Sequence, residues 1–458
     1  MSVKKWGGRL AMLLASDRVR DKRIFLLAWP VMAEMFLQTL TQMVDMAMVG
    51  RLGRAAIASI GLSMRPLFVA QAIFLGLGVA TTAMVARFIG AKDRERATIA
   101  AEQSMLTTSV LALALAAFGY YFARQIILFM GAEPEVVELG ISYLRGFSPG
   151  IFFLMLSTIM TAALRASGDT RTSFYAGMIS NAINVVGNYL LIFGHLGFPA
   201  LGVYGAAIAT SFSRLVMAAI LFVSLLRGQS GLHLTIKGFT YLDWDIIVRL
   251  FRIGVPAALE RLVQSVSMML HLRLLAVLGT TAVAVSTLSS NVEQLSFMPS
   301  IGFSVAASTL VGQSLGAKKP DEAEHNGWGA MRLACMFMGT MGLLFILVPG
   351  FFIRIYTSDP DVLLPGMTIL RIVGITQLPQ AIAFVASGIL RGAGDTRTVL
   401  NNAIIGNIAL RLGLSYLFII VLGWGMWSAF VAILMDWLVR GVLLSYWVAQ
   451  GKWKTTKV

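Results

Sequence analysis

Long apolar stretches alternate with short polar ones along the whole chain. The first apolar stretch, residues 24–49, reads IFLLAWPVMAEMFLQTLTQMVDMAMV and is long enough to cross a bilayer as a tilted helix. Eleven further stretches of this kind follow, near residues 56–88, 98–122, 137–164, 172–193, 203–226, 247–278, 282–314, 326–349, 362–390, 398–421 and 426–449. The pattern therefore predicts an all-α polytopic membrane protein with twelve transmembrane helices.

A repeat with a period of 226 residues relates the two halves of the chain. Pro30, Glu34 and Gln38 recur as Pro256, Glu260 and Gln264, and the loop LRASGDTRT at 164–172 recurs as LRGAGDTRT at 390–398. Each half holds six spans, an even number, so both halves begin on the same side of the membrane. Parallel repeats of this kind are related by an axis along the membrane normal, with substrate sites between the halves. This arrangement is typical of an alternating-access carrier.

The repeat and the polar stretches together predict the division into domains. We expect an N-lobe at residues 24–227 with spans 1–6 and a C-lobe at residues 246–450 with spans 7–12. A cytoplasmic linker at residues 228–245 joins them, and cytoplasmic terminal segments occupy residues 1–23 and 451–458.

The basic residues fix the expected orientation. The chain is 57% hydrophobic, 13% charged and carries a net charge of +15. Such a charge could indicate a nucleic-acid-binding protein, but the Lys and Arg residues lie in loops between apolar stretches. If the loops are sorted alternately, 23 Lys and Arg fall on the side of the N-terminus and four on the other. The positive-inside rule then places both termini in the cytoplasm, and no nucleic-acid partner is expected.

Three polar or helix-breaking residues interrupt the first span. Burying an ionisable side chain in a bilayer costs at least a few kcal/mol unless it is paired or hydrated. We therefore predict that Asp45 and Glu34 are functional residues. Asp45 lies fifteen residues after Pro30, about 22 Å along the helix, and could lower the cost of its charge by binding a proton or a small cation. Pro30 removes a backbone hydrogen bond and bends the helix, which suggests a hinge.

The repeat is broken at one of these positions, because His271 stands where Asp45 would recur. His271 is either a group that titrates near neutral pH or a packed, hydrogen-bonded side chain. Glu34 and Glu260 lie eleven residues before Asp45 and His271, about 16 Å nearer the cytoplasm. They could pair with intramembrane arginines as an inner gate, or could simply orient the lobes.

Three sequence motifs resemble those of the multidrug and toxic compound extrusion (MATE) family, of the prokaryotic NorM and DinF type. They are PVMAEMFLQTLTQMVDMAMVGRLG at 30–53, GLGVATTAMVARFIGAKD at 76–93 and the paired LRxxGDTRT loops. The resemblance covers nearly the whole chain. It implies two six-helix lobes around a V-shaped central cleft, and export of organic, often cationic and amphipathic compounds in exchange for H⁺ or Na⁺.

The resemblance also implies site residues. Asp45 matches the acidic residue of the N-lobe cation site, and the other matching positions are Asn184, Asn188 and Thr210, with the carbonyl of Ala206 as a further ligand. Oxygen donors of this kind suit Na⁺ if the protein is sodium-coupled, and would equally polarise a protonated carboxyl group. Some relatives carry a second Asp where this chain has Asn188, so Na⁺ binding should be weaker here and H⁺ coupling at least as plausible.

A second site in the C-lobe is less well supported. This chain has Gln264 where NorM-type proteins carry a glutamate, which argues against a C-lobe cation site of that type. Asp395 matches another acidic position of that lobe, but Asp169 is its repeat counterpart, and symmetric GDTR loops are more simply interpreted as turns with helix caps.

Two other functions are weighed against the exporter. A flippase for a lipid-linked precursor belongs to the same broad superfamily, although twelve spans and Asp45 favour the exporter. A membrane-embedded enzyme is disfavoured because no HExxH, GxSxG or clustered His ligands occur. No P-loop motif occurs either, so ATP is not expected. We expect a monomer in the bacterial inner membrane that meets small organic molecules and membrane lipids and needs no cofactor beyond its coupling ion.

Overall fold

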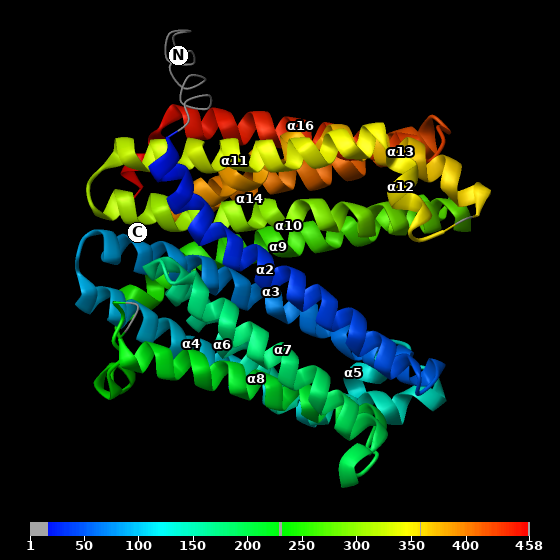
Figure 1. The fold of residues 1–458 in the computed structure, drawn as a ribbon, viewed down its shortest axis with the longest axis horizontal. Helices are drawn as coiled ribbons and strands as arrows, with labels where there is room; N and C mark the ends of the chain where they lie inside the picture. Colours follow the sequence, from blue (N-terminus) through cyan, green and yellow to red (C-terminus); the bar gives the residue numbers. More distant parts are fainter. Residues whose placement is uncertain (1–16, 229–230, 358, 457–458) are drawn as a thin grey trace. The chain divides into compact units, whose positions relative to one another are not determined.

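The computed structural model describes residues 17–228, 231–357 and 359–456, and this part of the chain folds almost wholly into helices (Figure 1). Twelve long helical segments follow one another in the predicted order. Their bounds are α2 (Arg18–Gly50), α3 (Arg54–Gly90), α4 (Arg94–Tyr121), α6 (Pro134–Ser167), α7 (Thr170–Phe193), α8 (Gly202–Arg227), α9 (Trp244–Ala276), α10 (Thr280–Gly316), α11 (Pro320–Leu347), α13 (Pro360–Gly392), α14 (Thr396–Ile404) with its continuation to Val421, and α16 (Trp427–Gln450). The short helices α5 (Ala123–Phe129) and α12 (Pro349–Arg354) lie between them.

Most of these segments meet the length and composition of a membrane span. Within the described residues, ten helices are long and apolar enough, and α10 adds an eleventh if its two arms, bent by 45° between Gln294 and Ser296, form one span. Helix α9 is 33 residues long but is not among them, because Glu260, Arg261 and His271 lower its apolar character. The all-α, multi-span fold class is therefore confirmed.

The eleventh span departs from a regular α-helix. After α14 the chain continues as the π-helical segment η3 (Ile405–Leu412), a single α-helical turn α15 (Gly413–Tyr416) and a second π-helical segment η4 (Leu417–Val421). The wider turn of a π-helix changes which side chains share a face, and such segments occur frequently at functional sites. Nothing in the apolar pattern predicts this change.

Aspartate caps explain where several helices begin. Asp169 accepts a hydrogen bond from the backbone N–H of Thr172 at 3.0 Å, and Asp395 accepts one from Thr398 at 3.2 Å. The preceding Gly168 has a φ of +99°, a conformation that glycine adopts without strain. The two GDTR loops are thus turns followed by N-caps, as the turn-and-cap interpretation predicts.

The chain divides into two compact units. The N-unit is Ala33–Ala258, and the C-unit is Leu259–Val458 together with the chain before Ala33. The boundaries fall inside α2 and α9, 226 residues apart, so the first half of α2 belongs to the C-unit and the first half of α9 to the N-unit. The two half-helices are thus exchanged between the units, and the predicted lobes, whose boundaries lie between spans, stay a prediction.

Close helix crossings at two glycines explain the exchange. In the N-unit, a Cβ added to Gly76 would lie 2.4 Å from the carbonyl oxygen of Gly254 and 2.7 Å from the backbone nitrogen of Ala258. In the C-unit, a Cβ on Gly302, the repeat counterpart of Gly76, would lie 2.6 Å from Cγ of Met32. Only glycine lets the helices approach this closely, as in other membrane helix pairs.

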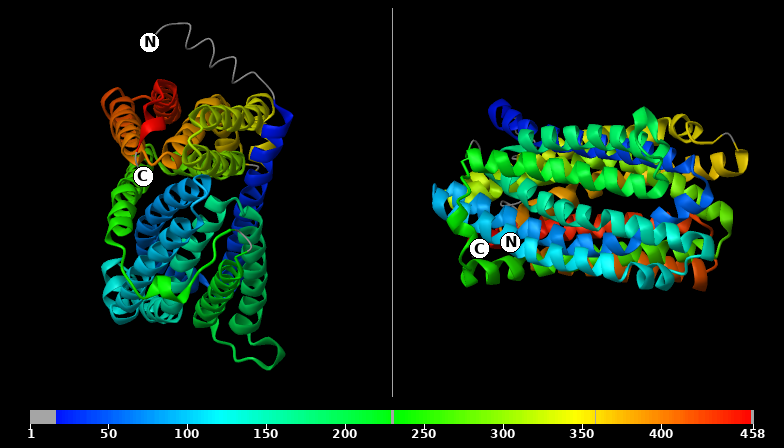
Figure 2. Two further views of the ribbon diagram at one scale, coloured as in Figure 1. Left: turned by 90° about the vertical axis from the view of Figure 1, so that its left-hand side faces the viewer. Right: turned by 90° about the horizontal axis from the view of Figure 1, so that it is seen from below.

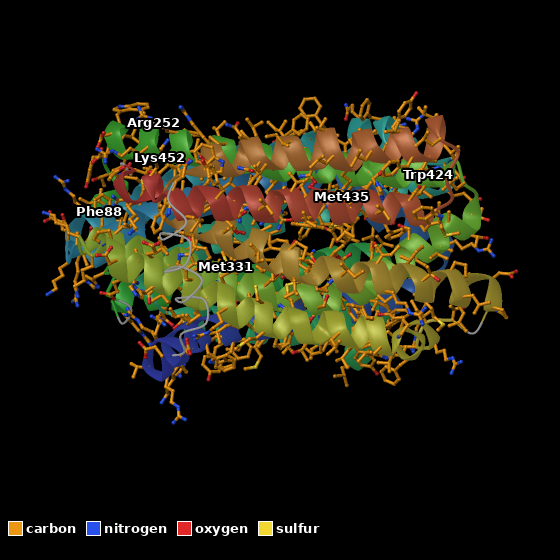
Figure 3. All side chains as sticks on the ribbon, turned by 90° about the horizontal axis from the view of Figure 1, so that it is seen from above. Phe88, Arg252, Met331, Trp424, Met435 and Lys452 are labelled. Carbon is orange, nitrogen blue, oxygen red and sulfur yellow. The ribbon has the colours of Figure 1, made fainter. Side chains whose placement is uncertain are left out.

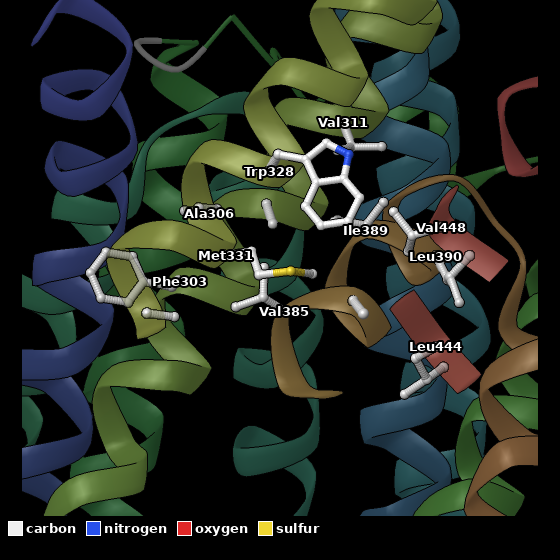
Figure 4. Packing of buried hydrophobic residues seen from close by; sticks show 14 of the residues in the cluster. Phe303, Ala306, Val311, Trp328, Met331, Val385, Ile389, Leu390, Leu444 and Val448 are labelled. Atoms are coloured by element: carbon white, nitrogen blue, oxygen red, sulfur yellow. The ribbon is translucent and has the colours of Figure 1, made fainter. Parts of the chain in front are cut away.

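The same packing plan recurs in both units. Helix α6 packs against α3, α4 and α8 in the N-unit, and α13 packs against α10, α11 and α16 in the C-unit (Figures 1 and 2). The C-unit core fills the space between these helices with fully buried side chains such as Met331, Val385 and Ile389 (Figure 4). The 226-residue repeat is therefore a repeat of structure as well as of sequence.

An aromatic cluster lies at one end of the C-unit helices. Lys452 and Trp424 lie at opposite ends (Figure 3). The ring of Trp424 stacks between those of Phe418 and Trp427, with centroids 4.9 and 5.7 Å away, and both tryptophans are exposed. Exposed aromatic rings of this kind are typical of the interface between bilayer and water.

Candidate functional site

The N-unit gathers the predicted N-lobe site residues into one polar cluster. Asn188 donates a hydrogen bond from Nδ2 to Oδ1 of Asp45 at 2.7 Å. Asn184 contacts Oγ1 of Thr210 at 3.1 Å, and the Thr210 hydroxyl donates to the carbonyl oxygen of Ala206 at 2.8 Å. Helices α2, α7 and α8 each contribute to the cluster, and both asparagines are buried.

Helical spacing and small residues position these side chains. Asn184 and Asn188 are four residues apart on α7, and Ala206 and Thr210 are four apart on α8, so each pair shares a face. The two helices pack closely because Gly205 lies against the backbone of α7, where a Cβ would be 2.3 Å from the carbonyl oxygen of Leu191. This contact brings short polar side chains within hydrogen-bonding distance.

The amide of Asn184 fits the cluster in two orientations. In one, Nδ2 donates to Thr210 and Oδ1 faces the carboxyl group of Asp45. In the other, Nδ2 donates to both Asp45 oxygens at 2.9 and 3.0 Å and Oδ1 accepts from Thr210. An amide oxygen facing a carboxyl oxygen requires a proton or a cation between them, whereas the amino group suits the bare carboxylate. Oδ1 of Asn188 is also buried and has no hydrogen-bond partner within the described residues. The arrangement can therefore hold Asp45 with or without a bound cation.

Arg214 is a residue that the sequence analysis did not assign to this site. It follows Thr210 by one helical turn on α8, and its charge acts on Asp45, Glu34 and the phenol of Tyr143. The signal that could have identified it is its repeat counterpart, Arg440, because few charged residues recur within the spans. The positive charge of Arg214 and the negative charge of an ionised Asp45 offset each other.

Glu34 and Glu260 each form an ion pair within their own unit. Glu34 pairs with Arg165 at 2.7 Å, and Glu260 pairs with Arg391. These two pairs are repeat counterparts of each other, and all four side chains are mostly buried. Each pair ties the middle of α2 or α9 to the end of α6 or α13. A gating role for the glutamates remains a prediction.

The candidates for a second site do not assemble in the C-unit. Nδ1 of His271 lies 3.1 Å from Oγ of Ser415, Gln264 is 3.5 Å from Arg261, and Asp395 caps α14. In the part of the chain that the structure describes, no hydrogen bond or ion pair joins His271, Gln264, Glu260 and Asp395 to one another. The same part holds no group of three or more His, Cys, Asp or Glu side chains that could bind a metal ion.

An ion cluster that the sequence analysis did not identify lies buried in the C-unit instead. Oδ2 of Asp436 is 2.7 Å from Nη2 of Arg411, and its Oδ1 is 2.6 Å from Nε of Arg440. Asp436 is completely buried.

The family model described as MatE matches this chain twice, at residues 30–190 and 256–417. The chain is 31% identical over 441 residues to the "Probable multidrug resistance protein NorM" of Thermotoga maritima, covering 95% of this chain and 94% of that protein. Its fold is similar to two solved structures, "Crystal structure of MATE in the straight conformation" and "Crystal structure of MATE in the bent conformation". Each superposes with a TM-score of 0.87 over 96% of this chain and 97% of the other, at 25% and 24% identity. This chain therefore belongs to the MatE family, the MATE multidrug efflux transporters.

Proposed function

We propose that the protein is a secondary antiporter that exports organic, often cationic and amphipathic compounds in exchange for an inward-moving ion, by alternating access between its lobes. The observation that carries this proposal is the cluster of Asp45 with Asn184, Asn188 and Thr210 in the N-unit. The name of the Thermotoga maritima relative, a probable multidrug resistance protein, supports the substrate class. No comparison supports the flippase alternative.

The coupling ion that we propose is the proton, with Na⁺ as the alternative. The cluster holds one carboxylate, and the charge of Arg214 acts on it. A proton binds covalently to one oxygen, whereas Na⁺ needs a shell of several oxygen ligands. Na⁺ would use Asp45 with the oxygens of Asn184, Asn188 and Thr210, and the carbonyl of Ala206 as a further ligand.

The proposed coupling step is a change of hydrogen bonding at Asp45. The carboxylate accepts hydrogen bonds from Asn188 and, in one amide orientation, from Asn184. A protonated Asp45 would donate its O–H to Oδ1 of Asn184. The hydrogen bonds that join α2 to α7 would therefore change when the proton binds. Pro30, inside α2, is the proposed hinge at which the helix bends or straightens. The shift can be no larger than the differential affinity of the ion for the two states.

The proposed setting is the bacterial inner membrane with both termini in the cytoplasm, which the distribution of Lys and Arg supports. We propose that the protein works as a monomer among membrane lipids, that the ion gradient supplies its energy, and that neither ATP nor nucleic acid takes part.

The test is efflux of a fluorescent lipophilic cation from proteoliposomes, with pH and Na⁺ gradients imposed separately. The proposal predicts that one gradient drives efflux by the wild type and that Asp45→Asn abolishes the driven component. Equal efflux by both proteins would remove Asp45 from the mechanism, and efflux that ignores both gradients would refute ion coupling.

A further inference from the structure

The buried ion cluster of the C-unit occupies the repeat counterpart of the N-unit site. Adding 226 to Asp45 gives His271, adding it to Thr210 gives Asp436, and adding it to Arg214 gives Arg440. The C-unit thus keeps a carboxylate and an arginine at this place, but the carboxylate has moved from the span containing Asp45 to the last span.

One further cation is present in the C-unit cluster. Arg411 comes from the π-helical segment η3, and its repeat counterpart is Val185, an apolar residue beside Asn184. Its guanidinium is 2.7 Å from Asp436, while Arg440 contacts the other oxygen of the same carboxylate at 2.6 Å. Both carboxylate oxygens are therefore already engaged by cationic nitrogen atoms.

Further polar and charged groups surround Arg411. Glu293 of α10 accepts a hydrogen bond from Gln380 at 3.1 Å, and the charge of Arg411 acts on Glu293 and on His271 of α9. On the other side, Glu260 acts on Arg440. The repeat counterpart of Glu293 is Leu67, so the N-unit has no acidic side chain at this position. Two guanidinium groups, those of Arg411 and Arg440, thus contact one carboxylate, that of Asp436.

An aromatic side chain also holds the arginines in place. The guanidinium of Arg440 lies 3.9 Å from the ring centroid of Trp437, and that of Arg411 lies 5.7 Å from it. Such cation–π contacts are strongest in desolvated sites, and here both arginines are buried. A cation fixed by covalent attachment, a carboxylate and a ring cannot exchange with solvent.

We infer that the guanidinium of Arg411 fills the C-unit counterpart of the ion-coupling site as a permanent internal cation, so that only the N-unit binds the coupling ion. The N-unit reaches the comparable state, one carboxylate with two cations, only when Asp45 has bound its ion in addition to the charge of Arg214. The inference rests on the proposed coupling role of Asp45, and it makes Arg411 the residue that limits the transporter to one coupling site.

The test compares ion-dependent stability in variants of the full-length protein in detergent micelles. The melting midpoint is measured against pH and against Na⁺ concentration. Wild type should show a shift that Asp45→Asn loses. In the Asp45→Asn background, Arg411→Met should restore an ion-dependent shift because Asp436 and Arg440 alone then resemble Asp45 and Arg214, whereas Arg411→Lys, which keeps the cation, should not.

The outcomes separate this inference from the proposed function. A folded Asp45→Asn/Arg411→Met protein without a restored shift overturns the inference, whatever its transport. Adding Glu293→Gln to the double variant identifies the carboxylate that binds the ion. If the restored shift disappears with this substitution, Glu293 rather than Asp436 binds the ion, and the inference is overturned. Should Arg411→Met not fold, counting bound ions in Asp45→Asn decides the matter, since the inference predicts none. Ion binding by Asp45→Asn overturns the inference if coupled transport is lost, and overturns the proposed function if coupled transport persists.

Discussion

Asn188→Asp tests the electrostatics of the N-unit site. Nδ2 of Asn188 is 2.7 Å from Oδ1 of Asp45, so a carboxylate at position 188 would place a second negative charge beside the first. Two carboxylates this close repel each other when the site is empty, and a bound cation relieves the repulsion. The substitution should therefore increase the affinity for whichever cation couples transport.

The geometry sets the magnitude. Two unit charges about 4 Å apart interact by about 4 kcal/mol at an effective dielectric constant of about 20. Asp45 is only partly buried, and solvent screening should reduce the effect to about 1.5–3 kcal/mol. Since 1.4 kcal/mol corresponds to a tenfold change in affinity, the cation concentration at half-maximal transport should fall by a factor of about 10 to 150.

The assay is the initial rate of efflux from proteoliposomes as a function of external pH and, separately, of Na⁺. Asn181→Asp is the matched control, because Asn181 lies on the same helix seven residues, about 10 Å, from Asn188. The control should leave half-saturation nearly unchanged. An unaltered half-saturation in a folded Asn188→Asp protein would refute the assignment of Asn188 to the site.

Three further predictions concern the scaffold of the site. Glu34→Gln removes one partner of a mostly buried ion pair and should lower the free energy of unfolding by about 2–4 kcal/mol, with a similar loss for Glu260→Gln. Wild-type melting midpoints in both variants would show that these ion pairs do not stabilise the contacts of α2 with α6 and of α9 with α13. Gly76→Ala places a methyl group 2.4 Å from the backbone oxygen of Gly254 and should lower the melting midpoint. The control Gly61→Ala, on the same helix with nothing within 4 Å, should leave the midpoint unchanged or raise it. Equal midpoints in the two variants would contradict the close helix crossing. Pro30→Ala should straighten α2 and slow efflux severalfold, and an unchanged efflux rate would dismiss the hinge.

Much of the fold could be predicted because a membrane span needs a long apolar stretch and the repeat doubles the signal. The predicted spans correspond in order to the twelve long helical segments, with ends that differ by a few residues; α2, for example, begins at Arg18 instead of residue 24. The exchange of half-helices could not be predicted, because it depends on which helix faces Gly76 and Gly302. The π-helical turns after Ile404 have no signature in the apolar pattern.

The candidate site, too, could be predicted only in part from the sequence. Asp45 is conspicuous as a carboxylate within a span, and the family resemblance indicated the asparagines and Thr210 that the structure brings to it. Arg214 was not assigned to the site, because the sequence does not show which way the side chain of an arginine within a span points. The pairing of Arg411 with Asp436 joins residues on different helices with no repeat to connect them, so only the three-dimensional structure could reveal it.

Ion movement driven by substrate tests the central claim most directly. Proteoliposomes that contain a pH-sensitive or Na⁺-sensitive dye receive a gradient of an organic cation and no ion gradient. Our account predicts that wild type moves the ion in the opposite direction to the organic cation and that Asp45→Asn, folded to the same extent, moves none. An ion flux of equal size in the two proteins, or none in the wild type while the organic cation still crosses, would contradict the account.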